Sequence, residues 1–361
     1  MRYYRLFLFF VLFLPNANAQ EKDLLNFIAR RPEKFAFILK EDDSVLVSIN
    51  ALEHVPQAGL FNILIAIEYA KQVASGRCNP EEKVSLKKLD SCNYFGGNYE
   101  VWKKYLQFKG KDIGGYVPLS EVVKGMISFS SDANATFLMN KLDIESINRN
   151  IYFLGIPSLK THEPLYQYSA ALVYGRMKDA GITDQERIAQ LKKMPLEEYV
   201  RHVNITNEMI QNNQGGLYEY AKLLRFDRDF AEVWYEKLPK STPQAYFELI
   251  DKVHRHQLLP QKAQAVLEEV LESLVMDDID TKTLFTRCGF KSGATPFSLS
   301  IAFYATMPSG KKYTLVSYLH HLDNNEYQEV AKHFHTFNLV LAVDEKFRQE
   351  VIQFLKGLQN K

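Results

Sequence analysis

β-Strand patterns stand at both ends of this chain, and a long helical region separates them. After a helical stretch from Glu21 to Arg31, "FAFILK" and "SVLVSIN" flank the polar residues 41–43, which predicts a β-hairpin. Near the other end, "FSLSIAFYATM" and "KYTLVSYLHHL" flank the turn residues 308–311. The chain then closes with the helically spaced "DEKFRQEVIQFLKGL". We therefore expect one antiparallel sheet built from both chain ends.

The middle of the chain is mostly helical and includes "PQAYFELIDKVHRHQLLPQKAQAVLEEVLESLV". We expect an α/β fold with two lobes: an α/β lobe from residues 20–55 and 284–361, and an all-helical lobe from residues 56–283. The segment near 181–240 is predicted to be a helical insertion. Because clefts between lobes are common places for binding sites, the functional residues are expected there.

The first residues predict export. Arg2 and Arg5 precede the apolar run "LFLFFVLFL", which is followed by Pro15 and the small-residue pattern of residues 17–19. This is typical of a signal peptide over residues 1–19, cleaved after Ala19. A membrane anchor would need about 20 apolar residues, and this run has about half as many. We expect a secreted protein in the bacterial periplasm, without a membrane span after cleavage.

Composition excludes one class of partner. The chain has 44 lysines and arginines against 43 aspartates and glutamates, so no overall positive field favours nucleic acid. The histidine pairs at 254/256 and 333/335 have a spacing that points to different faces of a helix, and acidic or cysteine partners are not evident. We therefore expect no metal site and no cofactor, and the sequence does not identify a protein partner.

The chain has three cysteines. Cys78 and Cys92 bracket a short loop, and a disulfide between them would leave Cys288 unpaired. The alternative is three reduced, buried thiols. The sequence cannot decide between these two states.

Three short motifs follow one another along the chain. "VPQAGLFNILIAIEYA" covers residues 55–70, "SSDANATFLMNKL" begins at Ser130, and "KSGA" begins at Lys291, directly before the C-terminal hairpin. Their order and setting resemble the serine β-lactamase and penicillin-binding protein superfamily, most closely class A β-lactamases. Those enzymes carry S-x-x-K at the start of a buried helix, then S-D-N, then K-T-G or K-S-G on an edge strand.

The first motif has lost its chemical groups. By this resemblance, Gly59 stands at the position of the nucleophilic serine, and Asn62 stands at the position of the lysine that activates it. Neither Ser48 nor Ser75, the nearest serines, has a lysine three residues later. The resemblance thus implies a catalytically impaired pseudoenzyme. The alternative is that Gly59 simply starts a core helix and the likeness is superficial.

The second motif is partly kept. Ser130 matches the hydroxyl that passes a proton to the leaving nitrogen, and Asp132 occupies the place of the usual asparagine. A carboxylate only accepts hydrogen bonds, so the exchange changes what a cleft can hold. A shifted register through Ser131 and Ala133 also loses the asparagine. The stretch could equally be an N-cap ahead of a helix.

The third motif is the best preserved. By the resemblance, Lys291 and Ser292 bind a substrate carboxylate, and Gly293 lets the ligand backbone lie close to the strand. A solvated lysine on an edge strand is the alternative. In "THEPLYQ", Glu163 matches the glutamate that activates deacylating water in class A enzymes.

Three functions remain open. The leading one is a binding pseudoenzyme for a peptidoglycan-type peptide, a β-lactam-like molecule or another carboxylate ligand, held by Ser130, Asp132 and residues 291–293. The second is an active serine hydrolase, with Ser130 as nucleophile and Lys291 as its partner. The third is a structural envelope protein.

Overall fold

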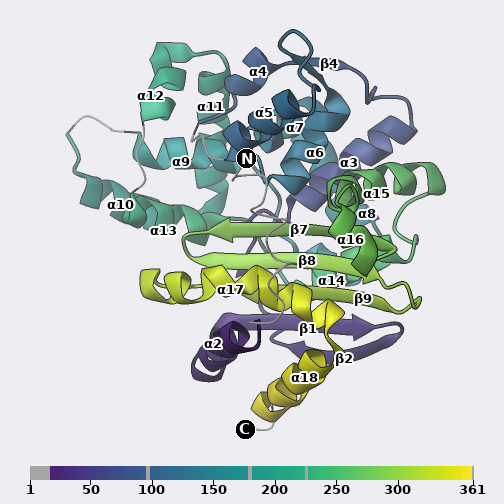
Figure 1. Cartoon of the computed structure of the whole chain (residues 1–361). Helices are drawn as coiled ribbons and strands as arrows, with labels where there is room; N and C mark the ends of the chain where they lie inside the picture. Colours follow the sequence, from purple (N-terminus) through teal and green to yellow (C-terminus); the bar gives the residue numbers. More distant parts are fainter. Residues whose placement is uncertain (1–16, 95–97, 178–180, 224–226, 360–361) are drawn as a thin grey trace. The chain divides into compact units, whose positions relative to one another are not determined.

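The computed structural model describes residues 17–94, 98–177, 181–223 and 227–359 (Figure 1). The chain divides into two compact units. The first comprises the residues up to Leu60 together with 152–162 and 240–361, and the second comprises 61–151 and 163–239. Each unit is described by itself. Of the predicted signal peptide, residues 1–19, residues 1–16 lie outside the described residues, and residues 17–19 open the first helix, Ala17–Arg30.

The first unit contains a five-stranded antiparallel sheet in the order β2-β1-β9-β8-β7. The strands are β1 (Phe35–Glu41), β2 (Ser44–Ile49), β7 (Arg287–Thr295), β8 (Ser298–Thr306) and β9 (Lys312–Leu319). Both predicted hairpins are confirmed, and β1 pairs with β9, so the two chain ends form one sheet. Strand β7, which carries Lys-Ser-Gly, lies at the sheet edge.

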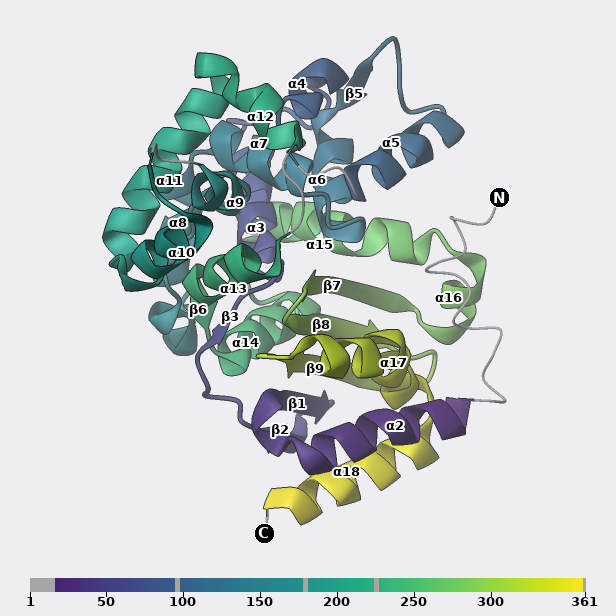
Figure 2. The same ribbon diagram turned by 90° about the vertical axis from the view of Figure 1, so that its left-hand side faces the viewer.

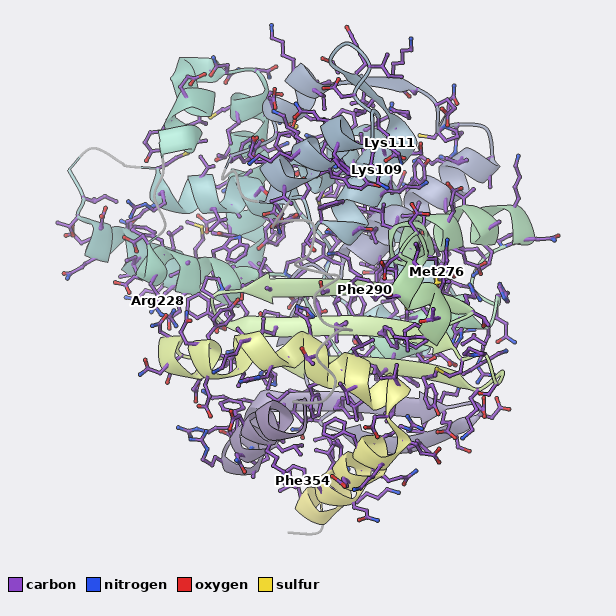
Figure 3. The ribbon with its side chains drawn as sticks, viewed as in Figure 1. Lys109, Lys111, Arg228, Met276, Phe290 and Phe354 are labelled. Atoms are coloured by element: carbon purple, nitrogen blue, oxygen red, sulfur yellow. The ribbon has the colours of Figure 1, made fainter. Side chains whose placement is uncertain are left out.

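Helices cover both faces of this sheet (Figure 2). On one face lie α2 (Ala17–Arg30), α17 (Asn324–Val343) and α18 (Glu345–Gln359). They form an apolar core with the strands, and Figure 3 labels two residues of this layer, Phe290 on β7 and Phe354 on α18. On the other face lie α14 (Pro243–His254) and α15 (Gln261–Met276), and α16 (Ile279–Leu284) leads into β7.

Helices α14 to α16 belong to the sheet-containing unit, whereas the sequence placed them in the helical lobe. His254 at the end of α14 explains the attachment. Its Nε2 lies 2.9 Å from Thr306 Oγ1 on β8, and its Nδ1 lies 3.1 Å from Thr314 Oγ1 on β9. Helical periodicity identifies an apolar face, but it does not say which element that face contacts.

Strand β7 is an edge strand, and α15 protects it. Arg287 of β7 lies 2.9 Å from Glu268 and 2.7 Å from Glu272, both on α15. Tyr304 of β8 donates a 2.5 Å hydrogen bond to Glu272. A Cβ at Gly289 would lie 2.5 Å from the Tyr304 hydroxyl oxygen, so the glycine makes room for this ring. The ion pairs and the tyrosine hold the strand that carries the third motif.

The second unit is helical, as expected for the middle of the chain. Its elements are α3 (Asn62–Ala74), α4 (Leu86–Asp90), α5 (Asn98–Phe108), α6 (Leu119–Ser128), α7 (Asp132–Leu142), most of α8 (Ile144–Phe153), α9 (Tyr168–Arg176), α10 (Asp184–Lys193), α11 (Leu196–Gln211), α12 (Leu217–Leu223), α13 (Arg228–Lys237) and the short pair β4 (Lys83–Ser85) and β5 (Tyr116–Pro118). Helix α3 is buried along most of its length and packs on α6 and α7. The predicted insertion forms α10 to α13, of which α10, α11 and α13 contact α9.

The three cysteines are free and buried. Cys92 Sγ lies 3.9 Å from Gln211 Nε2, and Cys78 Sγ lies 3.7 Å from Gln72 Oε1. Of the two states left open by the sequence, the structure has the reduced thiols. Among the described residues, we also find no helix with the length and apolarity needed to cross a bilayer.

The burial of His254 predicts a loss of stability in acid. Burial, with the charges of Arg287 and Lys312, lowers the pKa of His254 from 6.5 to about 3. The unfolded chain therefore takes up a proton below pH 6.5 that the folded chain does not. On acidification from pH 6.5 to 5, urea denaturation should show the unfolding free energy falling with a slope from this group that approaches about 1.4 kcal/mol per pH unit.

The variant His254→Gln should lower that slope by the contribution of about one proton. Gly357→Ala provides the control, because it changes no titratable group and should leave the slope of the wild-type chain unchanged. An equal slope in wild type and His254→Gln would contradict the assignment.

Candidate functional site

The stretch before Gly59 is fixed to the sheet-containing unit. Residues Val55–Pro56 form β3, which pairs with β6 (Lys240–Ser241). The buried Gln57 donates from Nε2 to the carbonyls of Val55 (2.9 Å) and Ser241 (3.1 Å). Its Oε1 accepts a 2.6 Å hydrogen bond from the Tyr318 hydroxyl. The sequence analysis missed Gln57, although a polar side chain within an apolar stretch was a signal for it.

The carbonyl of Ala58 lies directly against Gly293 on β7. A Cβ built at Gly293 would be 1.2 Å from the Ala58 oxygen, so only glycine fits there. The Ser300 hydroxyl on β8 lies 3.4 Å from the same oxygen, within donating distance. The resemblance implied that this glycine gives room to a ligand backbone. In the structure, the room is taken by the chain's own loop.

Gly59 has a left-handed backbone, with φ of +85°. A Cβ at this position would lie 3.2 Å from the Cα of Gly293. The division between the two units falls just after it, between Leu60 and Phe61. Gly59 thus precedes the buried helix α3, which begins at Asn62.

Asn62 is 2% exposed in the second unit. Its Oδ1 is buried and receives no hydrogen bond from the residues that the structure describes. An unpaired buried carbonyl oxygen is unfavourable, and a lysine at the same place would bring a donor. By the resemblance, asparagine replaces the family's lysine here. Its Oδ1 is a buried acceptor that a lysine ammonium would not bring.

Lys291 is fully buried, so the alternative of a solvated edge lysine is wrong. Its Nζ donates a 2.6 Å hydrogen bond to the Ser292 carbonyl. Its charge acts on α17, because burial together with Lys291 lowers the pKa of His335. Ser292 itself is half-buried. This end of β7 therefore combines a buried positive charge with a partly accessible hydroxyl.

The serine pair at 130–131 has two separate roles. Ser131 is the N-cap of α7, since its hydroxyl donates to Asn134 Oδ1 (2.9 Å) and accepts from the Asn134 backbone nitrogen (3.4 Å). The N-cap interpretation is thus confirmed for Ser131. Ser130 stands just before it with a left-handed φ of 52° and is half-buried. The Ser131 hydroxyl is therefore engaged in the helix cap.

Asp132 opens α7 and contacts a second helix. The Tyr168 hydroxyl, at the start of α9, donates a 3.0 Å hydrogen bond to Asp132 Oδ1. Burial, aided by the Asp132 charge, raises the pKa of Tyr168 well above its usual value, so the phenol stays protonated. Phe61 packs edge-on against the Tyr168 ring at 4.8 Å between centroids. The second unit therefore brings the starts of α3, α7 and α9 together.

The Glu-Pro stretch is an ordered loop that leads into α9. Asn148 holds Leu165 by two hydrogen bonds, one to its nitrogen (2.7 Å) and one to its oxygen (3.0 Å). Tyr166 is buried and donates to the Lys237 carbonyl at 2.6 Å. Glu163 is half-buried at the start of this loop, and with burial it raises the pKa of Tyr166.

The predicted site residues thus divide into two groups. Gly59 and residues 291–293 lie in the sheet-containing unit, where loop and strand touch. Asn62, Ser130, Asp132 and Glu163 lie in the helical unit. His254 ends α14 and His256 follows it, and His256 Nδ1 already has a partner, since it lies 2.7 Å from Glu268. In the described ranges, no group of three or more potential ligand side chains could hold a metal ion.

The contact of Ala58 with Gly293 predicts a large effect of one methyl group. In Gly293→Ala the new Cβ meets a backbone oxygen that three hydrogen bonds of Gln57 help to fix. We expect a loss of at least about 3 kcal/mol of unfolding free energy in denaturant titrations. Gly357→Ala on α18, where a Cβ meets nothing within 4 Å, should be neutral or slightly stabilising. A loss below about 1 kcal/mol at 293 would show that the loop yields easily.

The fold matches known structures over nearly its whole length. A class A β-lactamase from Bacteroides cellulosilyticus has 15% identity and a TM-score of 0.50, covering 90% of this chain and 99% of its own. A β-lactamase from Sphaerobacter thermophilus has 13% identity and a TM-score of 0.53, covering 89% and 97%. PBP-A, in an acyl-enzyme complex with penicillin G, has 12% identity and a TM-score of 0.51, covering 90% and 96%.

At these identities, the structural likeness establishes the fold. A comparison with curated proteins finds no match. The sequence profile of the Beta-lactamase enzyme family, however, matches residues 19–333, which is most of the chain. Together with the sheet built from both chain ends and the helical unit, this match identifies the chain as a member of the Beta-lactamase enzyme family.

Proposed function

We propose that this protein is a non-acylating member of its family, a pseudoenzyme that binds a carboxylate-bearing ligand without turning it over. The observation that carries the proposal is Gly59, which has no side chain and a φ of +85° at the family's nucleophile position. Without a hydroxyl, no acyl-enzyme can form there. Asn62, at the position of the activating lysine, cannot act as a base.

Residues 291–293 support the binding half of the proposal. Lys291 supplies a buried positive charge, and Ser292 beside it has a partly accessible hydroxyl. A charge in a poorly solvated setting attracts a carboxylate more strongly than one in water. A peptide of the peptidoglycan stem type, ending in a free carboxylate, is the class of ligand that fits.

The contact between Ala58 and Gly293 favours a second candidate, a structural envelope protein. The loop carbonyl takes the space that a ligand backbone would need across the glycine. If that loop stays in place, a ligand reaches only the partly accessible Ser292, or none binds. An active hydrolase using Ser130 and Lys291 is the third candidate, and it is tested together with the first.

The compartment completes the proposal. Arg2, Arg5 and the short apolar run that follows predict export, and the family match begins at residue 19, beside the predicted cleavage point. A periplasmic location would place the protein with peptidoglycan fragments. The protein partner, if it has one, is not identified by these features.

The proposal predicts that the protein forms no covalent adduct with penicillins. Loss of an activated serine costs a hydrolase about 10⁶-fold in turnover. Intact-protein mass spectrometry after incubation with a fluorescent penicillin should show the unmodified mass, and nitrocefin hydrolysis should equal that of buffer. A stoichiometric adduct would overturn the proposal, and an adduct on Ser130 would establish the hydrolase instead.

The double variant Gly59→Ser/Asn62→Lys, which restores the two side chains of the family's motif, is tested in the same experiment. A non-glycine residue in a left-handed conformation costs about 1 kcal/mol or more, and its Cβ would press on the Cα of Gly293. We expect a lower melting temperature and still no adduct. An adduct at position 59 would mean that only the two side chains, and not the loop, prevent acylation.

Binding is tested by thermal shift. Stem peptides ending in D-alanine should raise the melting temperature, since a ligand of the native state stabilises it by mass action. Amidated peptides, which lack the terminal charge, should not. Lys291→Met, which keeps the buried volume, and Ser292→Ala should each remove the shift, whereas Gly357→Ala should retain it. Equal shifts for both peptide forms would exclude carboxylate recognition, and no shift would favour the structural candidate.

A further inference from the structure

Exposed apolar side chains occur along α5, in the loop that follows it and at the start of β5. Phe108 is 73% exposed, Ile113 70%, Tyr116 47% and Val101 43%. These four are among only ten large apolar side chains exposed in the described part of the chain. Single exposed apolar residues need no explanation, but a group of them within one short segment often marks a binding surface.

The same segment carries a surplus of positive charge. Residues 101–116 contain lysines at 103, 104, 109 and 111 and one acidic residue, Asp112, although the chain as a whole is close to neutral. Lys103 is paired with Asp90, and Lys111 with Glu121. Lys104 and Lys109 are exposed and have no ion pair within the described ranges. Figure 3 labels Lys109 and Lys111 on this segment.

The loop is ordered without help from a partner. Ile113 and Tyr116 exchange two backbone hydrogen bonds of 3.0 and 3.3 Å. Asp112 Oδ1 accepts a hydrogen bond from the Gly115 nitrogen at 2.9 Å, so the one carboxylate of this segment bonds to the loop's own backbone. The Gly115 carbonyl accepts from the Leu86 nitrogen at 2.8 Å. Because the backbone is already fixed, binding through this loop loses little conformational entropy.

The loop, called the tip below, has open space around its three glycines. Gly110, Gly114 and Gly115 have left-handed φ values of +65°, +62° and +82°, and a Cβ at each would meet nothing within 4 Å. Ile113 stands five positions after Phe108, so their Cα atoms lie at most about 18 Å apart. The apolar side chains therefore project from an open tip, with lysines beside them.

We propose that this tip, formed by Lys104, Phe108, Lys109, Ile113 and Tyr116, docks the protein on a membrane leaflet rich in anionic lipid. Apolar side chains on a convex, basic surface suit the boundary between headgroups and acyl chains. Phe108 and Ile113 would enter the acyl region, and Tyr116 would stay at its edge. The lysine ammonium groups would lie among lipid phosphates. The inference is independent of the proposed ligand function.

The test uses the predicted mature chain, residues 20–361, which omits the apolar N-terminal run that could bind lipid by itself. The protein is sedimented with vesicles of equal parts phosphatidylglycerol and phosphatidylcholine, and with vesicles of phosphatidylcholine alone. We expect binding to the anionic vesicles only, and its loss when salt is raised to about 0.5 M. No binding to anionic vesicles, or equal binding to both kinds, would overturn the proposal.

Variants locate the contact. Lys104→Glu/Lys109→Glu should weaken the partition at least about tenfold, given about 1 kcal/mol for each basic side chain at an anionic surface. Phe108→Ser/Ile113→Ser should weaken it similarly. The matched control is Ile279→Ser, because Ile279 is 77% exposed and stands among Asp277, Asp278 and Asp280. Unchanged melting temperatures would show that all variants fold, and retained binding by either tip variant would refute the proposal.

A tryptophan reporter distinguishes insertion from attraction to any polyanion. In Ile113→Trp the emission should shift to shorter wavelength with anionic vesicles, whereas in Ile279→Trp it should not. Heparin, a polyanion without an apolar phase, should cause no such shift. An equal shift with heparin, or none with vesicles, would overturn the lipid assignment and indicate a polyanion or protein partner.

Discussion

The Ala58 carbonyl packs directly on the Cα of Gly293. This contact between two backbones determines which groups can lie against the edge strand β7. A single methyl group at 293 would coincide with the Ala58 oxygen, at 1.2 Å. Gln57 and the β3–β6 pair hold the loop in this position from the other side. The edge strand is therefore covered at its glycine by the chain itself, which also protects it from pairing with other chains.

The proposed loss of acylating chemistry would involve more than two side chains. The backbone at Gly59 is left-handed, which residues other than glycine rarely adopt. The loop geometry and the missing hydroxyl thus agree with each other. At Asn62 the buried Oδ1 has no donor among the described residues, and the neutral amide carries no charge at the position that the resemblance assigns to the lysine. Sequence and backbone both support the non-acylating interpretation.

Much of the fold could be predicted because it depends on local patterns. Alternation predicted the hairpins of β1–β2 and β8–β9, and helical spacing predicted α18. Contacts between distant segments were not accessible in this way. The pattern of α14 gave an apolar face without its partner, and nothing in the triplet Lys-Ser-Gly indicated that Lys291 would be fully buried. The pairing of Ala58 with Gly293 joins residues more than two hundred positions apart, and no spacing rule reaches so far.

A glycine in a motif can therefore have two explanations. The resemblance to class A enzymes interprets Gly293 as room for a ligand, yet the space beside a glycine can be taken by any backbone. Here the Ala58 carbonyl takes it, so the fold requires Gly293 whether or not a ligand binds. The presence of this glycine consequently says nothing about binding. The features that support a ligand are therefore the buried charge of Lys291 and the hydroxyl of Ser292. The packing of the loop on Gly293 does not require either group.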